Sequence, residues 1–237
     1  MISRLSEAAA LALLAFAAPA FAQATSCRLP SDIPPARAVS PPPDEARRSA
    51  PVAGYLLALS WSPEYCRTRA ASADDRLQCG SGNRFGFILH GLWPEASGPA
   101  APRWCRPAVP LPPALVRANL CATPSVQLIQ HEWAKHGTCA ARSPVGYFKA
   151  ASRLYASIRY PDMDGLSRRP LSVRAFRQAF ARANPGVTPA MLRVDANERG
   201  WLREVRLCLG VNLKPRPCAA FSRGENDTDG LKIWRGR

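Results

Sequence analysis

Hydrophobic and polar residues alternate with a period of two in some segments of this chain and with helical spacing in others. The first pattern predicts strands and the second predicts helices. Residues 52–61 are almost continuously apolar, which predicts a buried strand. Residues 84–90 and 202–209 alternate with a period of two, which predicts two further strands, and the apolar stretches 192–194 and 230–234 predict shorter ones. Strands are therefore predicted in both halves of the chain.

Helical spacing of apolar residues predicts helices between and after these strands. Three such segments are 111–120, 144–159 and 172–183. A fourth helix is predicted to begin with Thr123 as its N-cap and Pro124 in its first position, and to end near His136 with Gly137 as the stop signal. Helices and strands mixed in this order predict an α+β fold.

The first 22 residues have the pattern of a secretory signal peptide, with a basic Arg4, an apolar run over residues 8–18 and small residues before a cleavage site. Cleavage is expected after Ala22, with Ala24 as the alternative. The uncharged stretch is shorter than the ~20 residues that span a bilayer, which argues against a membrane anchor. We therefore expect an exported protein, secreted or periplasmic, with no membrane partner.

Residues 23–51 are rich in proline, which predicts an extended leader instead of a packed element, and residues 52–237 are expected to form the folded domain. All eight cysteines follow the predicted cleavage site, so up to four disulfides are expected. Cys66 and Cys79 bracket a polar segment that a local disulfide would close, and Cys27 can tether the leader. No Cys-x-x-Cys pair is present, so we expect no structural zinc site.

The net charge is +15, and loss of the signal peptide leaves it unchanged because one arginine and one glutamate leave together. Only four of the 32 basic residues are lysines. Arginine binds phosphate oxygens in pairs through its planar fork, so the composition favours a polyanionic partner. A general bias toward alanine, arginine and proline would give the same numbers, so charge alone does not name the partner.

The chain has three histidines, and all of them lie in two short motifs. The motifs are His90-Gly91-Leu92-Trp93-Pro94, expected at a strand end, and His131-Glu132-Trp133-Ala134-Lys135-His136-Gly137-Thr138-Cys139. On a helix that turns about 100° per residue, four polar side chains of the second motif fall within a sector of about 140°: His131, Glu132, Lys135 and His136. The tryptophan and alanine of the motif face away. Groups that titrate near neutral pH therefore share one predicted helix face.

Three interpretations of this face compete. A solvated helix face does not explain why two of the three histidines share it. A zinc protease places its histidines at i and i+4, whereas His131 and His136 stand at i and i+5, and Glu132 with His136 is the i,i+4 pair. Acid–base catalysis on a phosphodiester fits the set, with Lys135 stabilising charge on the phosphoryl oxygens and Glu132 orienting or supporting His136.

This chemistry points to RNA. No cluster of carboxylates is available for a two-metal site, so no metal and no cofactor are expected. Without a metal, an internal 2′-hydroxyl is a far better nucleophile than water, because it is already held beside the phosphorus. A 2′,3′-cyclic phosphate intermediate follows. Trp93 can stack on a base, and packing in the core is the alternative role for this side chain.

The segments Phe87–Pro94 and His131–Cys139 resemble, along their full length and in the right order, the two active-site segments of the ribonuclease T2 family. Leu59–Cys66 resembles the family's first strand and the cysteine that follows it, and the resemblance extends from residue 52 toward the C-terminus. It implies a central antiparallel sheet with flanking helices, stabilised by disulfides. The pairs that the resemblance implies are Cys105–Cys139 and Cys208–Cys218. The local pair Cys66–Cys79 would leave Cys27 with Cys121, and the pairing of these four cysteines stays open.

The resemblance also implies an endoribonuclease that cleaves single-stranded RNA through a cyclic phosphate. His136 is the implied base and His90 the implied acid of the first step, with Glu132 as the third catalytic residue. The side chains implied to bind substrate are His131, Lys135 and Trp93. We expect a monomer. A basic protein that binds polyanions with the same fold but without turnover is the main alternative, and the complete catalytic set argues against it.

Overall fold

The computed structural model describes residues 26–80, 82–222 and 224–236, and the predicted signal peptide lies outside these ranges. The strands are β1 (Gly54–Trp61), β2 (Phe87–Glu95), β3 (Leu171–Ser172), β4 (Leu192–Ala196), β5 (Leu202–Leu209) and β6 (Gly230–Leu231). The α-helices are α1 (Ser62–Cys66), α2 (Pro113–Asn119), α3 (Val126–Glu132), α4 (Thr138–Ala140), α5 (Pro144–Ser157), α6 (Met163–Ser167) and α7 (Val173–Ala183). Two π-helical turns, η1 (Arg76–Gly80) and η2 (Trp133–Gly137), and one 3-10 turn, η3 (Pro189–Met191), complete the helical segments.

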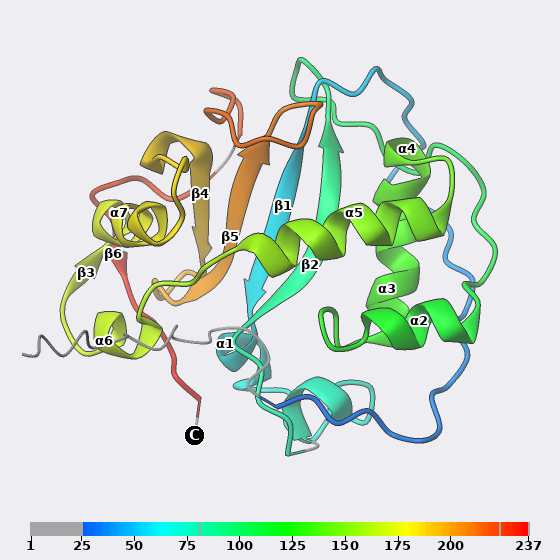
Figure 1. Cartoon of the computed structure of the whole chain (residues 1–237), viewed down its shortest axis with the longest axis horizontal. Helices are drawn as coiled ribbons and strands as arrows, with labels where there is room; N and C mark the ends of the chain where they lie inside the picture. Colours follow the sequence, from blue (N-terminus) through cyan, green and yellow to red (C-terminus); the bar gives the residue numbers. More distant parts are fainter. Residues whose placement is uncertain (1–25, 81, 223, 237) are drawn as a thin grey trace, which may run out of the picture.

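Four strands form one antiparallel sheet in the order β2-β1-β5-β4, and α5 crosses one of its faces (Figure 1). The helices α2 and α3 lie beyond the β2 edge in the same view. The predicted α+β fold with a central antiparallel sheet and flanking helices is confirmed. The predicted C-terminal strand forms only over β6, which pairs with β3 in a separate two-stranded sheet.

The two faces of the sheet differ in polarity because paired residues on neighbouring strands share a face and successive residues alternate. Leu59 pairs with Val205, and both are fully buried in the core that includes side chains of α5. The next pair, Ser60 with Glu204, faces the opposite way, and Asp195 of β4 lies beside Glu204 on that face. The sheet therefore presents a polar face opposite its apolar one.

The second strand differs from its prediction, since β2 extends past His90 to Glu95. The prediction that His90 stands at a strand end is wrong. Leu89 pairs with Leu59 and Gly91 pairs with Ala58, so His90 is the extra residue of a β-bulge. A bulge changes the direction of the side chain it inserts and is often found beside active sites.

The helix that follows also differs at both ends. Its N-cap is Ser125, whose hydroxyl accepts the Leu128 N–H, whereas Thr123 donates its hydroxyl to a carbonyl of β2. The helical path continues through η2 and α4 to Ala140, so Gly137 is not a stop. Gly137 has an ordinary right-handed helical conformation, and a Cβ there would overlap the ring of Trp133. Close packing explains this glycine.

The four disulfides are Cys27–Cys121, Cys66–Cys79, Cys105–Cys139 and Cys208–Cys218. The last two are the pairs that the resemblance implied, and Cys66–Cys79 is the expected local bond. The leader has no helix or strand over residues 26–51, in agreement with an extended segment. The expectation that it does not pack is wrong, because Ala36 is buried in the core and Arg48 pairs through its backbone with Arg103. No helix in the described part of the chain is long and apolar enough to span a bilayer.

Candidate active site

The bulge in β2 brings His90 next to the end of α3. Its Nε2 lies 3.6 Å from Oε1 of Glu132, and its side chain is 32% exposed. The His90 ring meets the Trp93 ring edge-on, with the ring centroids 5.0 Å apart. Residues from a strand and a helix about forty positions apart are thus joined in one site.

Glu132 is held by two features of β2. Its Oε2 accepts a hydrogen bond of 2.8 Å from Nε1 of Trp93, and its side chain is only 3% exposed. At Gly91 a Cβ would lie 2.7 Å from the Glu132 carboxyl carbon, so only glycine leaves room for this carboxylate. The helix-wheel argument expected Glu132 to support His136, but the carboxylate faces Trp93 and His90 instead. The Trp93 indole contacts both Glu132 and His136, and it is the indole N–H, not His136, that binds the Glu132 carboxylate.

His136 stacks on Trp93, with ring centroids 5.4 Å apart and an interplanar angle of 28°. Its Nδ1 is buried and has no hydrogen-bond partner among the described residues. Trp93 therefore contacts His90, Glu132 and His136 at once. The Trp93 ring is a common contact surface for His90 and His136. From the sequence, base stacking or core packing was the predicted role of this side chain.

His131 and Lys135 form a second cluster with the leader. Nζ of Lys135 lies 2.7 Å from Oε1 of Glu45, and Oε2 of Glu45 accepts a hydrogen bond of 2.9 Å from Nε1 of Trp104. The His131 ring meets the Trp104 ring edge-on at 5.4 Å, and Lys135 lies over the same indole at 5.9 Å. The disulfide Cys105–Cys139 fixes the residue after Trp104 to the end of this helical segment. Glu45 thus already holds the cation expected to bind phosphate.

His90 and His136 have opposite electrostatic surroundings. Burial lowers the pKa of His90, but its hydrogen bond to Glu204 and the charge of Glu132 outweigh this, so the net pKa is above 6.5. Burial also lowers the pKa of His136, and here the positive charges of Lys135 and the other histidines act in the same direction, so its pKa is well below 6.5. At a pH of about 6.5, which lies between the two pKa values, His90 is charged and His136 is neutral.

The other groups of the site also shift. Burial raises the pKa of Glu132 to about 7, although His90 and the Trp93 N–H lower it. Burial, Lys135 and His90 lower the pKa of His131. Burial alone would raise the pKa of Glu45, but the hydrogen bonds from Lys135 and Trp104 bring it below 4.5. Glu45 therefore stays ionised, whereas Glu132 binds a proton near neutrality.

Two acidic residues of the site were not found from the sequence. Glu204 accepts the Nδ1–H of His90 at 2.6 Å, and Glu45 binds Lys135. Period-two alternation over 202–209 places Glu204 on the polar face, but nothing in the sequence shows that His90 shares it. No signal marks Glu45. No three His, Cys, Asp or Glu side chains are grouped to hold a metal ion in the part of the chain that the structure describes.

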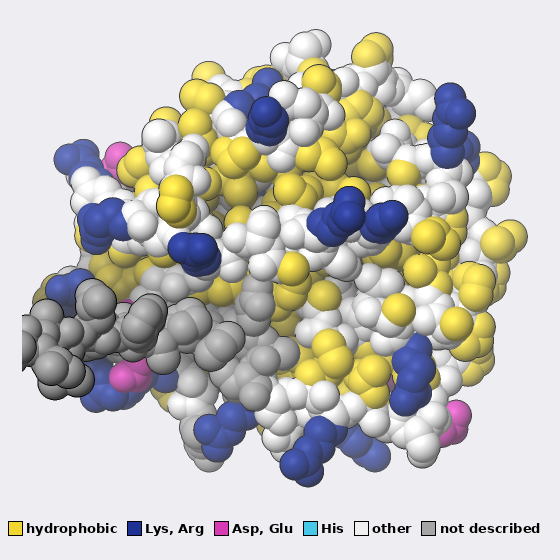
Figure 2. Space-filling view, in the orientation of Figure 1, with side chains coloured by type: hydrophobic (Ala, Val, Ile, Leu, Met, Phe, Trp, Pro, Cys, Tyr) yellow, Lys and Arg dark blue, Asp and Glu magenta, His cyan; other side chains and the backbone are white. Residues whose placement is uncertain are grey.

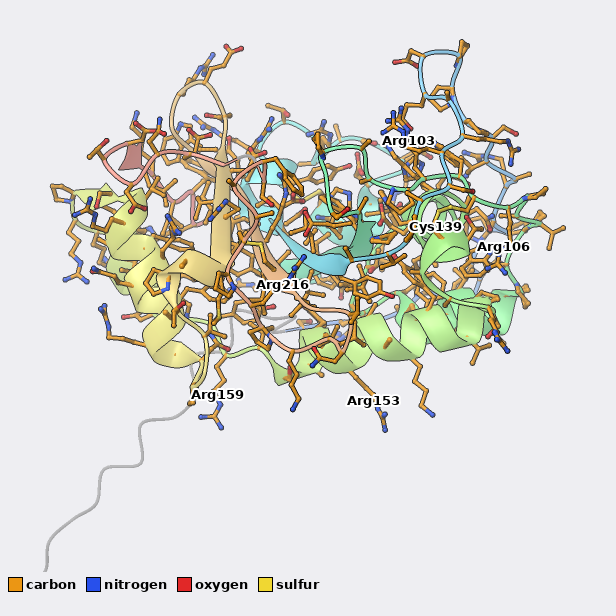
Figure 3. The ribbon with its side chains drawn as sticks, turned by 90° about the horizontal axis from the view of Figure 1, so that it is seen from above. Arg103, Arg106, Cys139, Arg153, Arg159 and Arg216 are labelled. Carbon is orange, nitrogen blue, oxygen red and sulfur yellow. A yellow bond between two sulfur atoms is a disulfide. The ribbon has the colours of Figure 1, made fainter. Side chains whose placement is uncertain are left out.

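Basic side chains surround the sheet. On the face that carries α5, lysine and arginine are far more frequent than acidic residues (Figure 2). Seen from above, Arg153 and Arg159 point outward on the α5 side, and Arg103 lies beside the leader loop near Cys139 (Figure 3). Arg103 reaches the same Glu45 oxygen as Lys135, at 3.9 Å. The Glu45 carboxylate therefore lies close to two cations, Lys135 and Arg103.

Comparison with known proteins agrees with the motifs. The model of the ribonuclease T2 family matches residues 53–214, and the chain belongs to this family. It is 37% identical over 160 residues to a probable ribonuclease of Haemophilus influenzae, covering 63% of this chain and 57% of that protein. It is also 37% identical over 163 residues to a ribonuclease of Aeromonas hydrophila, covering 65% of this chain and 70% of that one.

Solved structures share the fold at lower identity. Trichomaglin, described as an S-like ribonuclease, superposes with a TM-score of 0.61 at 21% identity, covering 77% of this chain and 97% of that one. RNase NT in complex with 5′-AMP gives a TM-score of 0.55 at 20% identity, covering 78% of this chain and 98% of that one. These similarities show the fold.

Proposed function

We propose that this protein is an exported endoribonuclease that cleaves single-stranded RNA without a metal, through a 2′,3′-cyclic phosphate. The observation that carries the proposal is that His90 and His136 both contact Trp93 and have pKa values shifted in opposite directions from 6.5. General acid–base catalysis requires this pair of protonation states.

The first step uses both histidines. Neutral His136 accepts the proton of the 2′-hydroxyl as O2′ attacks the phosphorus. The P–O5′ bond breaks, and His90 donates its Nε2 proton to the leaving O5′. The products are a 2′,3′-cyclic phosphate and a 5′-hydroxyl; His136 has gained the proton of the 2′-hydroxyl, and His90 has given one proton to O5′. DNA lacks the nucleophile and is not a substrate.

Glu132 and Lys135 stabilise the charge that gathers on the phosphoryl oxygens. A carboxyl group whose pKa is about 7 carries a proton in mild acid, so Glu132 can donate a hydrogen bond to an anionic oxygen instead of repelling it. Lys135 supplies a positive charge once it leaves Glu45. His131, beside Lys135, completes the cationic side of the site and contacts phosphate.

Family membership and the relatives named ribonuclease support this activity, and the complex of RNase NT with 5′-AMP is consistent with a nucleotide site in this fold. Four disulfides and the N-terminal pattern support export to an oxidising compartment, secreted or periplasmic. We propose that the protein acts there as a monomer. The matched region spans 57% of the Haemophilus influenzae relative.

The test is cleavage of a single-stranded RNA with and without EDTA, with product ends resolved by mass spectrometry. The expected result is undiminished cleavage to cyclic-phosphate ends in EDTA. His136→Ala should lose this activity while keeping the melting temperature of the wild type. Loss of activity on chelation refutes the mechanism. RNA binding without any product would support the polyanion-binding alternative.

A further inference from the structure

Glu204 stands behind His90, on the side away from Glu132. It lies on β5, opposite Ser60 of β1, and its side chain is 8% exposed. Oε2 of Glu204 is 2.6 Å from Nδ1 of His90 and also accepts the Ser60 hydroxyl at 3.0 Å. A buried carboxylate with this geometry fixes both the direction of the imidazole and the atom that carries hydrogen.

The other oxygen of Glu204 is also bound. Oε1 accepts Nε of Arg206 at 2.7 Å, and the Arg206 guanidinium binds Asp195 of β4 at 3.2 Å. The same guanidinium lies over the Trp93 ring, 5.4 Å from its centroid. Arg206 therefore contacts both Glu204 and Trp93, the ring that the two histidines share. Both oxygens of Glu204 are used, which keeps the carboxylate in one position.

An ionised Glu204 accepts only, so the hydrogen between it and His90 belongs to Nδ1. Burial would raise the pKa of Glu204, but His90 and Arg206 lower it to about 2, so the carboxylate is charged wherever the protein is active. Nε2 of His90 is then the atom turned toward the site, where Glu132 lies 3.6 Å away.

We propose that Glu204 is a positioning residue for the acid step, holding His90 by Nδ1 so that Nε2 faces the leaving 5′-oxygen. The catalytic part of this inference rests on the proposed function. In the step, Nε2 gives its proton to O5′ and His90 becomes neutral with its hydrogen on Nδ1. Glu204 keeps its charge and gains no proton. Its role is comparable to that of the carboxylate that orients the base of a serine protease.

The charge around His90 comes from several elements. Glu132 of α3 and Glu204 of β5 favour its charged form, and Arg206 of β5 disfavours it. His131 of α3 and His136 of η2 also interact with it electrostatically. Removing the charge of Glu204 leaves Arg206 close to His90, so the imidazolium should lose its proton more easily.

The test is Glu204→Gln, with Asp195→Asn as the matched control. Asp195 lies on the same face and pairs with the same Arg206, but no hydrogen bond or ion pair joins it to His90 among the described residues. The pKa of each of the three histidines is measured by NMR, and kcat and KM are measured against pH on RNA. In E204Q we expect the pKa of His90 to fall by about one unit or more, and the basic limb of kcat/KM to move to lower pH with it.

We expect kcat of E204Q to fall about tenfold or more while KM changes less than about twofold, because the contact acts on the transferring group. D195N should leave the pKa of His90 within a few tenths of a unit. An unchanged His90 pKa in folded E204Q, or an equal shift in D195N, overturns the proposal. A purely structural role would lower the melting temperature without moving the limb.

The wild-type protein gives a second test that needs no variant. Long-range ¹H–¹⁵N spectra above the pKa of His90 should show neutral His90 with its hydrogen on Nδ1. Hydrogen on Nε2 would overturn the proposal even if E204Q fails to fold. These spectra need no substrate, so they also separate the two claims. An Nδ1–H tautomer in a protein that does not cleave RNA would contradict the proposed function alone.

Discussion

Glu45→Gln should make this enzyme bind RNA more tightly. Glu45 holds the Lys135 ammonium at 2.7 Å, and a phosphate must displace it before Lys135 can bind substrate. A glutamine keeps an oxygen for the Trp104 N–H, but the amide nitrogen then faces Lys135, and two donors do not bind each other. The substitution therefore frees the cation without removing the leader from Trp104.

The structure gives the size of the effect. A charge-assisted hydrogen bond contributes about 1.5–3 kcal/mol when well shielded, and an exposed ion pair contributes about 0–1 kcal/mol. Glu45 and Lys135 are 23% and 21% exposed, so an intermediate value of about 1 kcal/mol applies. Since 1.4 kcal/mol is about tenfold, KM should fall by about fivefold, with kcat changed by less than about twofold.

The assay is steady-state cleavage of a short single-stranded RNA at fixed ionic strength. Removing a carboxylate also makes a basic protein more basic, so Glu198→Gln is the control, with the same charge change at an exposed position. E198Q should change KM by less than about twofold. If KM of E45Q is equal to that of E198Q, or higher than that of the wild type, Glu45 does not compete with phosphate and the reasoning is refuted.

Other predictions follow from the same contacts. The pH profile of kcat/KM, which reports groups of the free protein, should be bell-shaped. It should rise with a midpoint well below 6.5 as His136 loses its proton and fall above 6.5 as His90 and Glu132 lose theirs; a rising limb above 6.5 would contradict the assignment. Gly91→Ala should lower kcat about a hundredfold or more in a folded protein, because its Cβ displaces Glu132; retained activity would show that the carboxylate is dispensable. Trp93→Phe removes the indole N–H from Glu132, so kcat should fall by about 10–100-fold, and a fall of less than about threefold would remove this hydrogen bond from the mechanism.

Local patterns predicted much of the fold. The alternation over 202–209 coincides with β5, and the helical spacing over 144–159 and 172–183 corresponds to α5 and α7 within two residues at each end. These segments were predictable because the spacing of buried residues within one strand or helix can be read from the sequence of that segment alone. The two histidine motifs were also predictable, since their chemistry is contained in neighbouring residues.

The remaining features depend on contacts between distant segments. The bulge at His90 arises from the register between β1 and β2, which no local pattern specifies. Glu204 meets His90 only because β1 lies between their strands and Ser60 joins them. Glu45 reaches Lys135 because the leader packs on the domain, although its proline-rich composition predicted a segment that does not pack.

The roles of Gly137 and Trp93 also depend on the side chains around them in the folded structure. Gly137 looked like a helix stop, but the helical path continues through it, and the Trp133 ring occupies the space where a Cβ would lie. Trp93 offered either base stacking or core packing, and it lies between two histidines and a carboxylate. The roles of both residues were set by their neighbours in space.

The central claim is that the 2′-hydroxyl beside the scissile phosphate is the nucleophile. It is tested most directly with an RNA oligonucleotide that carries a single 2′-deoxy nucleotide at one otherwise cleaved position. Cleavage is expected to stop at that phosphate and to continue at its neighbours, in the presence of EDTA. Cleavage at the deoxy position at an undiminished rate would show that water or another group attacks, and would contradict the mechanism.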